Sequence, residues 1–192
     1  MNDAFTLPRI ITDRLVRGRV AADMLMVIGA SAIIAIAAQI SIPIPGSPVP
    51  LTLQPLAVIL VGATLGATRG AAAAALYLLE GFSGLPVFAG GYGGAIWLRG
   101  FTAGYLFSYP AAAFVAGWFS ERGWGNQVVR SIAGMLTALA VIYLGGWSWL
   151  AMLTNTRDAW SLGVAPFVLA DIIKIAIGAS LLPSAQRLAS RL

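Results

Sequence analysis

Residues 51–82 read LTLQPLAVILVGATLGATRGAAAAALYLLEGF, and the way in which this apolar stretch crosses a membrane decides the fold. The stretch is either one long tilted helix or two short helices that break at GATRG, residues 66–70. A single helix would hold Arg69 near the middle of the bilayer, at a cost of about 2.5–3.5 kcal/mol. A break would place Arg69 in a turn at the membrane surface instead. The rest of the sequence has to decide between the two.

The composition of the whole chain is that of a membrane protein. Of its 192 residues, 59% are hydrophobic and 10% are charged, and the mean hydropathy is +0.86. Soluble domains carry about 25% charged residues. Further apolar stretches, each long enough to cross a bilayer, occupy residues 20–42, 94–119, 128–153 and 166–188. The first is about 23 residues long, longer than the apolar core of a signal peptide, so we expect it to be retained as a helix.

The distribution of arginine favours the break, because loops on the cytoplasmic side of a membrane are enriched in basic residues. If the stretch breaks, almost all arginines outside the spans lie on the side of the two termini, and the opposite side keeps only Arg157. Without the break, this asymmetry disappears. We therefore predict an all-α integral membrane protein with six transmembrane helices and both termini in the cytoplasm. It forms a single membrane domain over residues 1–192, in which residues 1–19 are a cytoplasmic N-terminal segment.

Two connections on the outer side differ from ordinary solvated loops. Residues 43–50, PIPGSPVP, are rich in proline, and residues 81–94, GFSGLPVFAGGYGG, are rich in glycine. Neither can be helical throughout, because proline lacks a backbone donor and clustered glycine disfavours the helix. Both are nevertheless largely apolar. These irregular segments either line a cavity at membrane depth or form stiff turns at the surface.

Charged residues inside the predicted spans are few, and Glu80, Arg99, Asp171 and Lys174 lie at a similar depth near the outer surface. Asp171 and Lys174 are three residues apart, so they share one helix face and can neutralise each other. Ionisable residues inside a membrane are costly and commonly functional. Arg99, Lys174 and Asp171 together carry a net charge of +1. This charge suits a small ligand that is a monoanion at one end and has polar N–H groups at the other. The alternative is an ion pair that only locks helices together.

Several classes of function are excluded by composition. The chain contains neither cysteine nor histidine, so disulfides, the usual zinc sites and thiol- or histidine-dependent catalysis are ruled out. The arginines are dispersed between apolar runs and form no basic patch, which argues against nucleic-acid binding. We expect a protein that is not an enzyme and that holds no metal and no cofactor.

A pair of small residues in the first span permits close contact with another helix. Ser31 and Ala35 are four residues apart, the spacing of the small-xxx-small motif. The contact is made either within the chain or with a helix of a partner protein. Ser31 and Ala35 are therefore candidate partner-docking residues.

Five blocks of the sequence closely resemble the BioY family. The blocks are QISIP at 39–43, PVPLTLQ at 48–54, GLPVFAGG at 84–91, GFTAGY at 100–105 and DIIK at 171–174. They run in the family's order and cover about residues 30–179. BioY proteins are the biotin-binding, six-helix S-components of energy-coupling-factor (ECF) vitamin transporters. The resemblance implies a biotin site on the outer side of the membrane.

The resemblance also implies a biological role and partners. It implies high-affinity biotin binding and uptake across the cytoplasmic membrane of a prokaryote, by a multi-pass protein that captures the substrate. The implied partners are a transmembrane coupling subunit and two ABC-type ATPases. Some family members are found without a dedicated module, so a solitary biotin transporter is an alternative. An S-component for another small carboxylate vitamin is a second alternative.

The resemblance assigns candidate substrate-binding residues. Asp171 and Lys174 match the family's ligand-contacting Asp-x-x-Lys. Leu106 stands where some members have an arginine, and Arg99 is our candidate for the missing anion contact. The glycine-rich loop and its neighbouring blocks add Gln39, Phe88, Gly91, Tyr92 and Gly93. Tyr92 occupies a place where some members use a polar amide.

Overall fold

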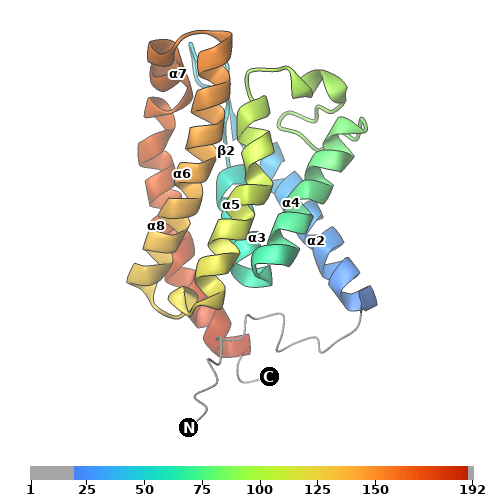
Figure 1. The fold of residues 1–192 in the computed structure, drawn as a ribbon, viewed down its shortest axis with the longest axis vertical. Helices are drawn as coiled ribbons and strands as arrows, with labels where there is room; N and C mark the ends of the chain where they lie inside the picture. The colour runs from blue at the N-terminus through green and yellow to red at the C-terminus, as the bar shows by residue number, and fades with distance from the viewer. Residues whose placement is uncertain (1–19, 190–192) are drawn as a thin grey trace.

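The chain forms a bundle of long helices that run side by side (Figure 1). The computed structural model describes the backbone of residues 20–189 and the side chains of residues 20–183, so the predicted N-terminal segment 1–19 lies outside the described residues. The helices are α2 (Val20–Gln39), α3 (Gln54–Leu65), α4 (Ala67–Phe82), α5 (Ala103–Glu121), α6 (Val128–Leu153), α7 (Thr156–Gly163) and α8 (Ala165–Ala189). Two 3-10 turns, η1 (Ala95–Leu98) and η2 (Trp124–Asn126), and two short strands, β1 (Ser41–Ile42) and β2 (Leu51–Thr52), complete the described elements.

The decisive stretch 51–82 forms two helices, as predicted. Helix α3 ends at Leu65 and α4 begins at Ala67. Between them Gly66 has φ +89°, a conformation that side-chain-bearing residues rarely adopt. Arg69 lies in the first turn of α4, where its guanidinium forms an ion pair with Asp23 of α2 at 3.0 Å. Arg69, whose burial cost argued against a single long helix, thus connects the α3–α4 turn to α2 through this ion pair.

Among the described residues, three helices are long and apolar enough to cross a membrane. They are α2, α6 and the part of α8 from Ala165 to Pro183. Helix α3 is apolar but has only 12 residues, and α4 has 16. The sequence also predicted these two spans to be short. The structure thus has the mostly helical, apolar architecture that was expected.

Helix α5 lies at the centre of the bundle, where it packs closely against α3, α4 and α6. Glycines make this possible: a Cβ at Gly62 would collide with the carbonyl oxygen of Ala113, and one at Gly117 would collide with the backbone of Ala67. On the other side of α5, a Cβ at Gly104 would collide with Trp149 of α6. Close backbone approach through small residues is the usual means of helix packing in membranes.

This packing predicts that Gly62→Ala destabilises the protein. We expect the free energy of unfolding to fall by about 1–3 kcal/mol, because the added methyl forces α3 away from α5. Gly29→Ala in α2 is the matched control, since a Cβ there meets nothing within 4 Å and alanine favours the helix. Thermal unfolding in detergent should separate the two variants. Equal midpoints would contradict the close contact of α3 with α5.

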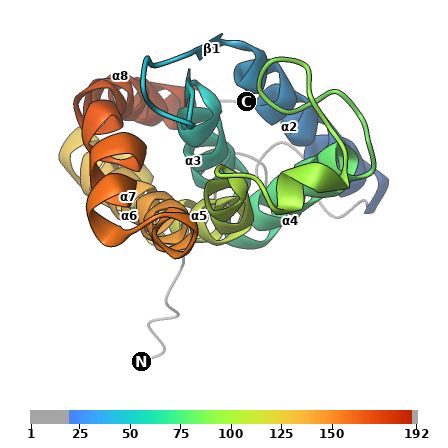
Figure 2. The same cartoon turned by 90° about the horizontal axis from the view of Figure 1, so that it is seen from above.

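The two irregular connections lie at the same end of the bundle (Figure 2). Strands β1 and β2 pair antiparallel, Ser41 with Thr52 and Ile42 with Leu51, and so close the proline-rich segment into a loop. The glycine-rich segment folds back on itself through a bridge between Phe88 and Tyr92. Helix α7 lies at this end as well (Figure 1). The hydroxyl of Ser47 donates to the carbonyl oxygen of Leu162 at 2.6 Å, which ties the proline-rich loop to α7.

Candidate binding site

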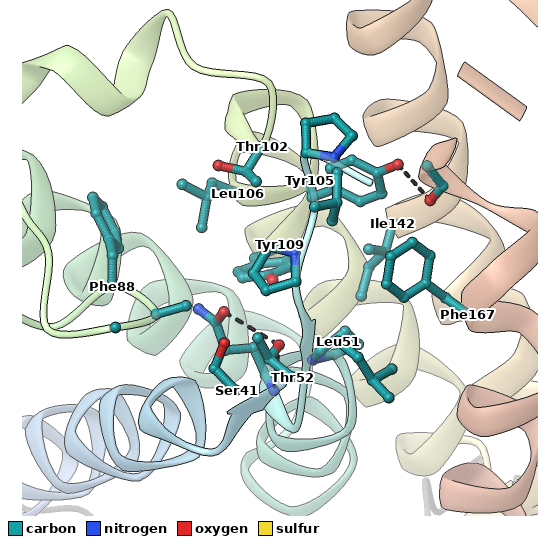
Figure 3. A pocket seen from close by; sticks show the side chains of 18 of the residues that line it. Ser41, Leu51, Thr52, Phe88, Thr102, Tyr105, Leu106, Tyr109, Ile142 and Phe167 are labelled. Carbon is teal, nitrogen blue, oxygen red and sulfur yellow. Dashed lines mark hydrogen bonds between the residues drawn. The ribbon is translucent and has the colours of Figure 1, made fainter. Parts of the chain in front are cut away.

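A cavity of about 240 Å³ lies between the two irregular connections and the neighbouring ends of α5, α6 and α8 (Figure 3). Its wall is mostly apolar and includes Phe88, Trp97, Leu106, Ile142 and Phe167. A small set of polar groups from α3, α5, α6 and α8 faces the same space. An apolar wall with a few polar groups is typical of small-molecule sites. Both irregular connections contribute to this cavity, the first through residues 48–50 and the second through Phe88, Ala89, Gly90 and Tyr92.

Asp171 and Lys174 form the ion pair that their spacing predicted. The ammonium of Lys174 donates to Asp171 Oδ1 at 2.7 Å, and the two side chains are only 5% and 16% exposed, Asp171 being the more buried. The ammonium also donates to the backbone carbonyl of Thr52 in β2, at 2.7 Å. Asp171 lines the cavity, whereas Lys174 is not among the lining residues. Lys174 therefore holds the proline-rich loop against α8 from behind Asp171.

Tyr143 of α6 completes this cluster. Its hydroxyl donates to Asp171 Oδ2 at 2.7 Å, and its side chain lines the cavity. Each carboxylate oxygen of Asp171 thus accepts one hydrogen bond from the protein and keeps a further lone pair for a donor in the cavity. Tyr143 was not predicted from the sequence, because its hydroxyl is one of several in the span 128–153, together with those of Ser131, Thr137 and Ser148.

A second polar network begins at the cavity wall, which Thr52 and Gln54 both line. The side-chain amide of Gln54, which is 4% exposed, donates to the hydroxyl of Tyr77 at 2.6 Å. The hydroxyl of Tyr77 donates in turn to the carbonyl oxygen of Val87 at 3.3 Å. Thr52, the residue whose carbonyl binds Lys174, donates its own hydroxyl to the Gln54 amide oxygen at 3.3 Å. This chain of hydrogen bonds connects the proline-rich loop to the glycine-rich loop.

The predicted residues of the glycine-rich loop divide into lining and shaping residues. Phe88 and Tyr92 line the cavity. Gly91 and Gly93 do not line it; Gly91 has φ +74°, and a Cβ at Gly93 would collide with the carbonyl oxygen of Leu85. Gln39, also outside the wall, donates its side-chain amide to the carbonyl oxygens of Val87 and Phe88, at 3.3 and 3.2 Å. Gln39 therefore holds the loop in place from α2.

Arg99 lies apart from this cluster. It follows η1, is exposed and is not among the residues that line the cavity. From the sequence we expected Arg99 to lie at the same depth in the membrane as Asp171 and Lys174 and to share one site with them. Among the described residues, no ion pair or hydrogen bond joins Arg99 to Asp171 or Lys174. The charged residue that lines the cavity is Asp171, with Lys174 paired to it from behind.

The candidate docking residues face the inside of the described fold. Ser31 has no exposed surface, and its hydroxyl donates to the carboxylate of Glu80 in α4. Ala35 is half-buried and packs against the hydrophobic core. Of the two alternatives for this pair, the structure contains the contact within the chain.

Comparison with known proteins decides the family. The family model described as "BioY family" matches residues 8–191, which is almost the entire chain. The chain belongs to the BioY family. The resemblance seen in five sequence blocks is thereby confirmed, over a longer region than the blocks cover.

Curated relatives and a solved structure agree with membership of the BioY family. A protein of Pyrococcus horikoshii named "Probable biotin transporter BioY" is 43% identical over 145 residues, which cover 76% of this chain and 84% of that protein. The "Biotin transporter BioY" of Thermotoga maritima is 41% identical over 150 residues, covering 78% and 86%. The crystal structure of an S-component for biotin from an ECF-type ABC transporter has a TM-score of 0.79 and covers 91% of this chain and 94% of that chain. At 24% sequence identity this likeness concerns the fold.

Proposed function

We propose that this protein binds biotin and takes it up across the cell membrane, as the substrate-capture component of an ECF-type transporter. The observation that carries the proposal is the buried cluster of Asp171, Lys174 and Tyr143 at the wall of a mostly apolar cavity. Membership of the BioY family, whose curated relatives are named biotin transporters, supports the choice of ligand.

The chemistry of biotin matches this cavity. Its cyclic urea presents two N–H donors and a carbonyl acceptor, and its sulfur-containing ring and alkyl chain are apolar. The free lone pairs of Asp171 suit a ureido N–H, and a hydrogen bond to a charged acceptor is stronger than one between neutral groups. Phe88, Phe167 and Ile142 offer apolar surface for the ring and chain. Lys174 contacts the ligand or keeps Asp171 oriented toward it.

Thermal unfolding of the purified protein in detergent, with a panel of vitamins, tests the choice of ligand. A ligand that binds only the folded state stabilises it by about 2.7 kcal/mol at one hundred times its Kd. We expect biotin to raise the unfolding midpoint more than any other vitamin in the panel. If another small carboxylate vitamin stabilises the protein and biotin does not, the proposed substrate is wrong.

We further propose a partner complex and a location. A coupling subunit and two ABC-type ATPases would energise uptake by this multi-pass protein of the cytoplasmic membrane, and ATP hydrolysis would belong to those partners. A pull-down of the native membrane complex tests this arrangement. Recovery of the coupling subunit with both ATPases supports it, whereas biotin uptake by the chain without them supports a solitary transporter.

The proposed topology has six spans, formed by α2, α3, α4, α5, α6 and α8. The arginine distribution supports cytoplasmic termini. It also supports an outward-facing cavity, because the turn between α3 and α4 lies at the opposite end of the bundle from the irregular loops (Figure 1).

Single cysteines test this topology cleanly, since the chain has no native cysteine. We expect Arg157→Cys to react with a membrane-impermeant maleimide in intact cells, and a cysteine in the α3–α4 turn to react only after the cells are opened. Arg69→Cys breaks the ion pair with Asp23, so the exposed neighbour Thr68→Cys serves as a second variant. Labelling of position 68 or 69 from outside would overturn the six-span arrangement.

A further inference from the structure

Tyr109 of α5 carries a buried hydroxyl that has no hydrogen-bond partner among the described residues. The residue is only 4% exposed and lines the cavity. Among the described residues its hydroxyl makes no hydrogen bond, and it is not among the polar atoms sealed away inside the protein. In Figure 3 the Tyr109 side chain lies between Phe88 on one side and Ile142 and Phe167 on the other. Its small remaining surface therefore faces the cavity.

The other buried tyrosines around the site have partners. Tyr105 donates its hydroxyl to the carbonyl oxygen of Gly163 at 2.6 Å, and Tyr143 donates to Asp171 at 2.7 Å. The hydroxyl of Tyr77 donates to Val87 and accepts from Gln54. Burying a hydroxyl without a hydrogen bond is costly, so such a group in a native structure calls for an explanation. At the wall of a binding cavity, the simplest explanation is a partner that arrives with the ligand.

The surroundings of Tyr109 indicate what kind of partner this is. Tyr109 of α5 and Asp171 of α8 line the same cavity. Asp171 has lone pairs to offer, whereas a tyrosine hydroxyl supplies a donor. A cyclic urea, which carries N–H donors directly beside a carbonyl acceptor, fits an acceptor and a donor that share one cavity.

We infer that Tyr109 donates its hydroxyl hydrogen to the ureido carbonyl oxygen of bound biotin, while Asp171 accepts from a ureido N–H. Tyr109 is then a specificity-determining residue of the site. The inference rests on the proposed function, because it takes biotin as the ligand. It adds a residue from α5 to the site. Helix α5 then binds the carbonyl acceptor of the ureido ring through Tyr109, and α8 binds an N–H donor of the same ring through Asp171.

Tyr109→Phe tests this assignment, because it removes the hydroxyl and keeps the ring. Isothermal titration of the purified full-length protein with biotin should give a Kd about tenfold weaker than that of the unaltered protein. The loss should be the same for biotin methyl ester, which lacks the negative charge but keeps the urea. The unfolding midpoint of the ligand-free variant should be unchanged or higher, since an unpaired buried hydroxyl has been removed.

Tyr105→Phe is the contrasting variant. Its hydroxyl is committed to Gly163, so its removal should lower the unfolding midpoint of the ligand-free protein. Unchanged biotin affinity in Tyr109→Phe overturns the inference, and so does a loss that disappears with the methyl ester. Failure of the unaltered protein to bind biotin would instead overturn the proposed function.

Discussion

Asp171→Asn is expected to weaken biotin binding by about 10- to 150-fold and to lower the stability of the ligand-free protein. A hydrogen bond to a charged group is worth about 1.5–3 kcal/mol, which gives the range of affinities. Stability falls because Lys174 is left as a buried ammonium without its counter-charge, and breaking such a pair costs about 3–5 kcal/mol. Lys174→Gln should have the same two effects, because it leaves Asp171 unpaired and releases the carbonyl oxygen of Thr52. Titration with biotin and thermal unfolding measure the two effects separately.

The double variant Asp171→Asn/Lys174→Gln separates a binding role from a structural one. It restores neutrality without restoring a charged acceptor for the ligand. We expect it to be more stable than either single variant and still to bind biotin poorly. Near-native affinity in the double variant would show that the pair is only a structural lock, and the site assignment would then be wrong.

Ser31→Trp is expected to abolish both folding and biotin binding. Ser31 has no exposed surface and lies against Glu80 of α4, so an indole cannot be accommodated without separating α2 from α4. Yield of folded protein by size-exclusion chromatography, followed by biotin titration, measures the effect.

Ala32→Trp is the matched control, because it places the same side chain on the exposed face of the same helix. This variant should fold and bind biotin like the unaltered protein. Energised uptake by Ala32→Trp and Ala35→Trp in the presence of the partner subunits then reports on docking at α2. If Ser31→Trp binds biotin normally but loses energised uptake, the contact within the chain is unimportant and Ser31 docks the partner.

The parts of the fold that could be predicted are those governed by local chemistry. The cost of burying Arg69 and the arginine distribution predicted the break that the structure has at Gly66. The spacing of Asp171 and Lys174 predicted their ion pair, since residues three apart share one helix face. Helix α7 was missed, although Asn155 caps it by accepting from the backbone N–H of Asp158. Asparagine is a preferred N-cap residue, so this signal was present in the sequence.

What could not be predicted depends on contacts between distant segments. Tyr143 reaches Asp171, and Lys174 reaches Thr52, only because α6, α8 and β2 meet in space. The small-xxx-small pair at Ser31 has the same spacing whether its partner belongs to the same chain or to another. The predicted span 94–119 placed Arg99 on a helix at the depth of the site, but α5 begins only at Ala103 and Arg99 lies before it, after the turn η1.

A structure of the purified protein saturated with biotin tests the central claim most directly. We predict one biotin molecule in the cavity between Phe88 and Phe167, with a ureido N–H within hydrogen-bond distance of the Asp171 carboxylate. Biotin bound elsewhere on the protein, or bound in the cavity without contacting Asp171, would contradict this account.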